Sequence, residues 1–163
     1  MEKALRGSMS PNFVPQILGG CVVEQAGATQ GINDLLMQSY NGVIELFASE
    51  QGWGDVAKSA GAGEPIASFA ALRARGAFLV SATLVASSDH PGWEARGVVV
   101  VSEAGAACTL AAIWPGKMLG VTDRATGALV PVALVRNHPT LGPIYQFHTL
   151  TGHTYDVAPS TLQ

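Results

Sequence analysis

Four histidines carry most of the chemistry that this sequence offers, and all of them lie in the second half of the chain. His148 and His153 flank a predicted turn at Thr151-Gly152, so the strand register can bring them about 5 Å apart. Two imidazoles at that distance can ligate a metal ion, and a third ligand would have to come from His138, Asp156 or Asp89. The spacing matches no metal-binding motif, and a metal site demands a full ligand set. We therefore expect two partly exposed strand residues here, with neither a metal nor another cofactor.

General acid–base catalysis is the second chemistry to consider. The candidates are Asp89, His90, Glu94 and His138, because an unperturbed histidine, with a pKa of about 6.5, exchanges protons near neutral pH. The run Asp89-His90-Pro91-Gly92 is also ordinary turn composition, and a turn is the interpretation that we favour. The sequence has no Gly-x-Ser-x-Gly elbow, no G-x-G-x-x-G motif and no phosphate-binding loop. Taken together, these observations argue against an enzyme.

Cysteine and tryptophan complete the residues with distinctive chemistry. We expect Cys21 and Cys108 to be reduced and to serve as small buried apolar residues, since free cysteine is among the most buried residue types. Trp53, Trp93 and Trp114 lie at or beside predicted turns. Tryptophans in such places can anchor a subunit interface, rim a pocket or close one end of the core, and we predict the interface role.

Scarcity of charge is the clearest compositional feature of the chain. Only 13% of the 163 residues are charged, against about 25% in an ordinary globular domain, while 48% are hydrophobic. The hydrophobic content excludes a disordered chain, two cysteines exclude a disulfide-dense scaffold, and a net charge of −3 argues against a nucleic-acid binder. Alanine and glycine enrichment dilutes charge by itself. The interpretation that we favour is that part of the surface is buried between subunits.

The sequence shows neither a signal peptide nor a membrane-spanning segment. The longest strongly apolar charge-free runs are Gly76–Ser88 and Ala104–Gly116, which have 13 residues each, whereas a transmembrane helix needs about 20. We expect a cytoplasmic protein or a component of an assembled particle. Residues 1–8 end in Gly-Ser directly before Met9, which is typical of an expression-tag remnant, so we leave them out of the fold argument.

Two helices are predicted in residues 29–76. Between Ile32 and Phe47, apolar residues recur with the i, i+3, i+4 spacing of an amphipathic helix that ends near Gln51-Gly52, with a kink at Asn41-Gly42. Residues 52–63 are rich in Gly, Ala and Ser and are predicted to be a connection. A second short helix is expected between Pro65 and Gly76, since proline favours the first helical turn and glycine the position after the last.

From Ala77 onward the hydrophobic period changes to two, which predicts six or seven antiparallel strands over 77–158. We expect strands at 77–86, 93–102, 107–113, 118–122, 128–136, 144–150 and 153–157, with Pro131 marking an edge or a bulge. The first of these segments can alternatively extend the preceding helix. The predicted fold is therefore α+β: one domain, 9–163, with two N-terminal helices packed on an antiparallel meander that forms a curved sheet or flattened barrel. The expected core is Ile32, Leu35, Leu36, Val43, Ile44, Phe47, Phe69, Leu72, Phe78, Val80, Leu84, Val98, Val100, Leu110, Ile113, Leu119, Val132, Leu134, Ile144 and Phe147.

The function that these features favour is a non-enzymatic structural subunit that associates with copies of itself through low-charge β-rich surfaces, as in a virion- or tube-like assembly. One alternative is a small-molecule-binding protein or enzyme with an apolar pocket between helices and sheet and histidines as its polar groups. Another is an interaction module that binds a peptide along an edge strand. The positions of the histidines discriminate: convergence on one cavity favours the pocket, and scatter over the surface favours the assembly.

Overall fold

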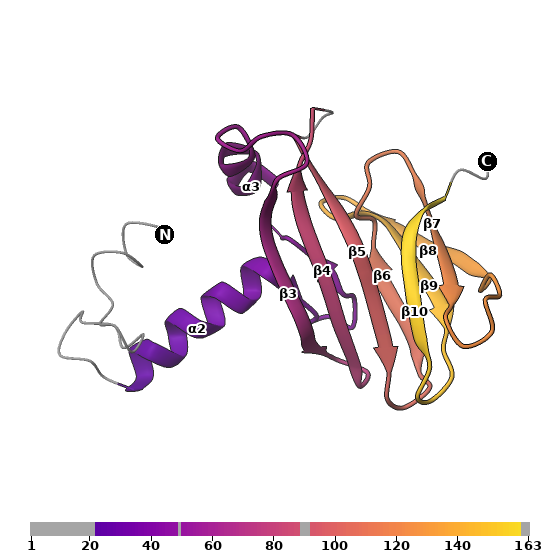
Figure 1. The fold of residues 1–163 in the computed structure, drawn as a ribbon. Helices are drawn as coiled ribbons and strands as arrows, with labels where there is room; N and C mark the ends of the chain where they lie inside the picture. The colour runs from indigo at the N-terminus through magenta and orange to yellow at the C-terminus, as the bar shows by residue number, and fades with distance from the viewer. Residues whose placement is uncertain (1–21, 49, 89–91, 161–163) are drawn as a thin grey trace. The chain divides into compact units, whose positions relative to one another are not determined.

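The computed structural model describes residues 22–48, 50–88 and 92–160 (Figure 1). The chain divides into two compact units, residues 1–35 and 36–163. The described part of the first unit lies in helix α2 (Val22–Leu36). In its last turns the side-chain amide of Gln30 donates to a carboxylate oxygen of Asp34 at 2.6 Å, an i, i+4 pair of the kind that stabilises exposed helices.

The long helix that was predicted to run through Ile32 and Phe47 and to end near Gln51-Gly52 is wrong beyond Leu36. The chain continues as a two-stranded hairpin, β1 (Met37–Gln38) and β2 (Glu45–Leu46), in which Asn41-Gly42 forms part of the turn. Gly42 has a φ of 72°, a conformation that glycine adopts without strain. The physical reason for the error is that Asn-Gly is a stronger signal for a hairpin than for a helix kink. Helix α3 (Glu50–Ala57) then forms where a connection was expected.

The second predicted helix is also wrong, because its residues form strand β3 (Pro65–Ala74). Pairing with β4 (Phe78–Ala86) supplies the backbone hydrogen bonds that a helix would otherwise provide. Pro65 opens an edge strand, where its missing N–H costs nothing, and Gly76 makes the hairpin turn at a φ of 87°. Both residues that suggested helix ends therefore mark strand ends instead.

The remaining strands follow the predicted positions closely. They are β5 (Trp93–Ser102), β6 (Ala107–Ala111), β7 (Met118–Asp123), β8 (Val132–His138), β9 (Gly142–His148) and β10 (Thr154–Ser160). Segment 77–86 is a strand, which resolves the alternative of a longer helix.

The strands are antiparallel, as expected, but they do not form a meander covered by helices. They build a five-stranded sheet of order β3-β4-β5-β10-β7 and a three-stranded sheet of order β6-β9-β8, in addition to the β1-β2 hairpin. The last strand, β10, is inserted between β5 and β7 (Figure 1). The α+β prediction, including its helical part 29–76, is therefore wrong: the protein is mostly β, with three sheets.

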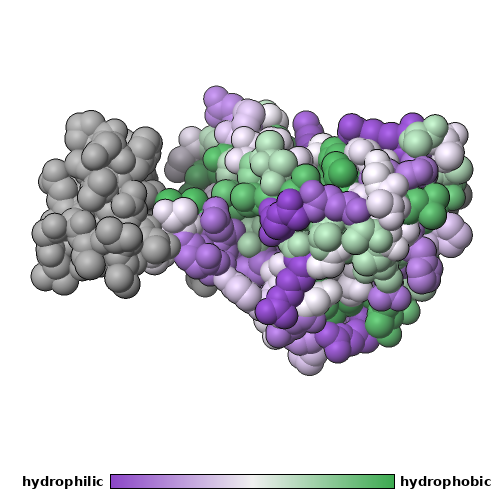
Figure 2. Space-filling view, turned by 90° about the horizontal axis from the view of Figure 1, so that it is seen from below, coloured by the Kyte–Doolittle hydropathy of each residue, from purple (hydrophilic) through white to green (hydrophobic). Residues whose placement is uncertain are grey.

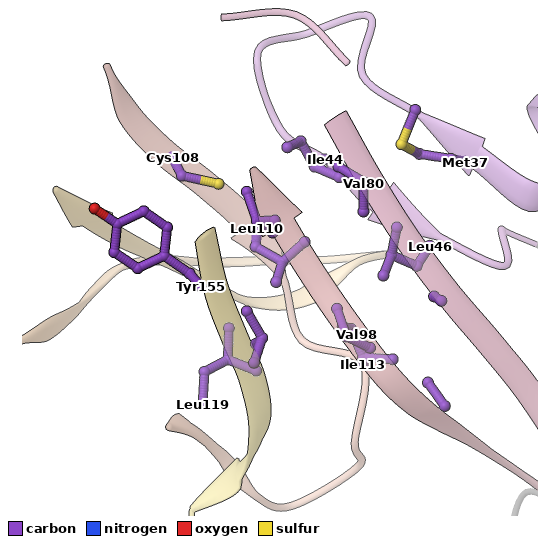
Figure 3. Close-up of a cluster of buried hydrophobic side chains, with 14 of the residues drawn as sticks. Met37, Ile44, Leu46, Val80, Val98, Cys108, Leu110, Ile113, Leu119 and Tyr155 are labelled. Carbon is purple, nitrogen blue, oxygen red and sulfur yellow. The ribbon is translucent and has the colours of Figure 1, made fainter. Parts of the chain in front are cut away.

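One large hydrophobic core lies between the sheets (Figure 3). Every strand except β8 contributes buried side chains to it. The rings of Phe147, on β9, and Tyr155, on β10, join the two larger sheets with centroids 5.9 Å apart. Most of the predicted core residues are buried. Leu134 is the clear exception, since its relative exposure is 52%, and six others are only half-buried: Ile32, Leu35, Leu36, Phe69, Leu72 and Val132.

No helix in the described part of the chain is both long and apolar enough to cross a membrane.

Candidate functional site

The histidines in the described residues do not converge on one cavity. The Nδ1 atom of His138, at the end of β8, accepts hydrogen bonds from the backbone amides of Thr140 and Leu141, both at 3.2 Å. His148 is exposed at the end of β9, in the three-stranded sheet. His153, just before β10, pairs with Asp123. The structure thus places these three imidazoles in three separate settings.

The other acid–base candidates are equally dispersed. Asp89 and His90 lie outside the residues that the structure describes. Glu94, on β5, forms an ion pair with Arg96 at 3.1 Å, so its carboxylate is engaged with a neighbour on its own strand. Asp156, considered as a metal ligand, accepts two hydrogen bonds from the guanidinium of Arg124, at 2.6 and 2.8 Å. Within the described ranges, no three His, Cys, Asp or Glu side chains are grouped so that they could hold a metal ion.

The three tryptophans occupy different depths. Trp114 is buried, and its indole N–H donates to the carbonyl of Ala95 at 3.0 Å, which fixes the ring inside the core. Trp53, on α3, meets the Phe47 ring edge-on with centroids 6.0 Å apart. The buried ring nitrogens of Trp53 and Trp93 have no hydrogen-bond partner among the described residues. The interface role of these residues stays a prediction.

A pocket of about 720 Å³ in the described structure has the general character of a ligand-binding site. It lies where β2, the start of β5, the connection from β6 to β7 and the loop before β9 come together. Its volume is within the range of small-molecule sites, which are usually apolar with a few polar groups. The walls are mainly apolar and aromatic, and include Leu46, Phe47, Trp93, Ile113, Trp114, Met118, Leu141 and Tyr145.

Glu45 is the acidic side chain in this pocket wall. Burial raises the pKa of its carboxyl, and the nearby His138 opposes that shift without preventing it. The other carboxylates whose side chains the structure describes each make a hydrogen bond or an ion pair: Asp34, Asp55, Glu64, Glu94, Glu103, Asp123 and Asp156. Among the described residues, Glu45 has no such partner. Sequence reasoning missed it, although a single acid between Val43-Ile44 and Leu46-Phe47 is a detectable signal.

A second polar cluster joins β7 to β10. The His153 Nδ1 atom lies 2.8 Å from Asp123 Oδ2, and the side chain of Asp123 is almost fully buried. The hydrogen bond to His153 lowers the pKa of Asp123, against the effect of desolvation, and backbone amides of Ala125 and Thr126 lower it further. Sequence reasoning named His153 but missed Asp123, which lies 30 residues earlier in the chain.

This Asp–His pair could orient an imidazole for proton transfer, but the nearby hydroxyls have other roles. The buried hydroxyls of Ser102 and Thr149 bond to each other at 2.7 Å, and Thr149 also donates to the carbonyl of Ala106. Cys108 is fully buried, which raises the pKa of its thiol to about 12 and keeps it protonated at neutral pH. None of these three groups is set up as an activated nucleophile.

The chain matches no known protein-family model, and no curated protein sequence is similar to it.

Proposed function

We propose that this protein is a non-enzymatic structural subunit that associates with further copies of itself through the open edge of β8. The observation that carries the proposal is that β8 has one edge without a neighbouring strand in its sheet. In the three-stranded sheet β8 pairs only with β9, and five of its seven residues are exposed. An open edge strand presents unpaired backbone donors and acceptors, which another strand can satisfy.

The other ends of the two larger sheets are better protected. β6 is capped by Ile44, whose amide donates to the carbonyl of Thr109 at 2.8 Å. Beyond β7, the amide of Val130 donates to the carbonyl of Val121 at 2.8 Å. β3 begins at a proline and has register shifts between Pro65 and Ala67 and between Phe69 and Leu72, and such irregularities make an edge less able to pair. Among the described strands at the ends of the two larger sheets, β8 is therefore the least protected.

The surface around this edge is apolar and nearly free of charge. Leu134 and Val135 are each 52% exposed, and Leu129, shortly before the strand, is 69% exposed. Arg136 is the only charged residue of β6, β8 and β9. On the five-stranded sheet, by contrast, exposed ion pairs such as Arg124–Asp156 keep the surface polar. Figure 2 shows one face of the molecule, on which hydrophobic and hydrophilic residues are interspersed.

The scatter of the described histidines also supports an assembly rather than a histidine-lined pocket. In the described structure none of them is part of the 720 Å³ pocket wall. The buried Ser102–Thr149 pair and the protonated Cys108 thiol give no support to a nucleophilic enzyme.

Light scattering over a dilution series tests the proposal. We expect a stable oligomer or larger assembly that Val135→Lys weakens by about tenfold or more in dissociation constant, since a buried lysine at a strand edge opposes pairing. Val56→Lys is the matched control, because Val56 is 50% exposed on α3 and the change adds the same charge. A monomer at every concentration would contradict self-association. Equal weakening by both variants would show that charge in general, and not the β8 edge, matters.

A further inference from the structure

The pocket beside Glu45 has a combination of features that self-association does not require. Its walls are mainly apolar, its volume of about 720 Å³ suits a small molecule, and its acidic side chain, Glu45, makes no hydrogen bond or ion pair with the described residues. From this combination we infer that the pocket is a binding site for a small organic cation, an amine carried on an aromatic or aliphatic body. The inference depends on residues other than those of the β8 edge.

The apolar walls fit the body of such a ligand. Phe47, Trp93, Trp114 and Tyr145 contribute aromatic surface, while Ile113 and Met118 contribute aliphatic surface. Burying apolar surface favours binding but carries little directional specificity. Aromatic faces also attract cations, so these walls favour an amine over a neutral or anionic group of the same shape.

Glu45 supplies the charge that selects the ligand. A partly buried carboxylate is costly unless it is paired. Ile44 and Leu46 are buried in the core, while Glu45 lies between them in the sequence and lines the pocket. A ligand ammonium within hydrogen-bond reach would provide the missing partner. A charge-assisted hydrogen bond of this kind is among the stronger polar interactions in proteins.

Two basic residues near the pocket do not provide that partner. His138 opposes the rise in the pKa of Glu45, but no hydrogen bond or ion pair joins the two side chains in the described structure. The Nδ1 atom of His138 instead accepts two backbone N–H bonds. Lys117 is part of the pocket wall but is exposed, and makes no ion pair within the described structure. Its flexible stem allows the ammonium to extend into water.

Binding measurements with three matched probes test the inference. The probes are 2-phenylethylamine, neutral 2-phenylethanol and anionic 3-phenylpropionate, followed by calorimetry and by NMR shifts of the tryptophan indole protons. We expect the amine to bind more tightly than either of the other two. Glu45→Gln should weaken amine binding by about tenfold or more, whereas the matched control Glu103→Gln removes the same charge outside the pocket and should leave it unchanged.

A second variant keeps the test independent of any effect on folding at Glu45. Met118 is 46% exposed on the pocket wall, so Met118→Lys should fold and should repel the amine. Loss of amine binding in Met118→Lys and Glu45→Gln, with normal binding in Glu103→Gln, is the expected pattern. Tighter binding of the anion, equal binding of all three probes, or no binding at millimolar concentration would overturn the inference. The β8 variant Val135→Lys should bind the amine normally, which separates this result from the oligomer test.

Discussion

Asp123 and His153 join two neighbouring strands of the five-stranded sheet at one end, with 2.8 Å between Asp123 Oδ2 and His153 Nδ1. The connection is reinforced on both sides. Asp123 also accepts the backbone amide of Ala125 through its other oxygen at 2.9 Å, and the His153 ring stacks on Tyr155 with centroids 6.4 Å apart. The hydroxyl of Tyr155 in turn accepts the amide of Leu150 at 2.7 Å. This network holds the turn before β10 against the turn after β7.

The first prediction concerns the pH dependence of this network. Because the folded-state pKa of Asp123 is lowered, its carboxylate stabilises the fold above the unfolded pKa of about 3.9, and this contribution is lost as the pH falls through the lower folded pKa. Asp123→Asn should therefore destabilise the protein near neutral pH, and the difference from wild type should vanish in strong acid. Urea unfolding of both proteins from neutral to strongly acidic pH measures this difference in unfolding free energy. Asp55→Asn, at an exposed ion pair on α3, should show no comparable difference.

The second prediction uses two leucines that flank the same tyrosine. Leu110 on β6 and Leu134 on β8 both pair in register with Tyr145 on β9, yet their exposures are 0% and 52%. Leu110→Ala should cost about 2–5 kcal/mol of unfolding free energy, as truncations in a packed core do. Leu134→Ala should change it by less than about 0.5 kcal/mol, measured at a concentration below any oligomer dissociation constant. Equal losses at the two positions would contradict the burial of Leu110.

The third prediction concerns two turn glycines with similar backbones. Gly105 and Gly127 have φ values of 72° and 70°, so alanine at either position is strained by about 1–2 kcal/mol. At Gly105 a new Cβ would also lie 2.8 Å from Thr151 Oγ1 and 3.1 Å from the Thr151 amide nitrogen, whereas at Gly127 it meets nothing within 4 Å. Gly105→Ala should thus be clearly the more destabilising change in thermal unfolding. If Gly127→Ala were the more destabilising change, the close approach of Gly105 to Thr151 would be contradicted.

The fourth prediction is the inertness of Cys108. With its pKa raised to about 12 and its side chain fully buried, the thiol should resist iodoacetamide at about pH 8 in the native protein. It should react fully after denaturation in urea. The measurement is mass spectrometry on the Cys21→Ser variant, which leaves a single thiol. Rapid labelling of the native protein would contradict the packing of β6 against the core.

The fifth prediction follows from the raised pKa of Glu45. An acid whose folded pKa lies above its unfolded value favours folding at low pH, and this contribution is lost as the pH rises through the folded pKa. Glu45→Gln should therefore stabilise the ligand-free protein near neutral pH, because it removes a partly buried charge that has no hydrogen bond or ion pair among the described residues. The gain should disappear in acid, where the wild-type carboxyl is also neutral. A loss of stability at neutral pH would show that the charge of Glu45 has a partner in the fold.

The local strand pattern of residues 77–160 follows from the sequence alone. Alternation of apolar and polar residues, with turn residues between the segments, places β4 to β10 within a few positions of where they occur. β5 coincides with its predicted range because the Val98–Val101 run suits a strand with apolar surroundings. The predicted helices in 37–76 were wrong. Asn41-Gly42, Pro65 and Gly76 occur at helix ends or kinks and also at hairpin turns or strand ends. Only the strands that pair with these segments distinguish the two structures.

Sheet order and the polar contacts were decided by tertiary structure. No local pattern indicates that β10 inserts between β5 and β7, because that placement is set by which apolar faces meet in the core. The same holds for Asp123 and His153, which are 30 residues apart and become partners only through β7–β10 pairing. Leu134 looks like a core residue because its strand alternates, but β8 ends a sheet and leaves it exposed. The sequence by itself thus determined most of the strands and the low charge. Long-range packing determined the open edge at β8 and the position of Glu45 in the pocket wall, because both depend on neighbours distant in the chain.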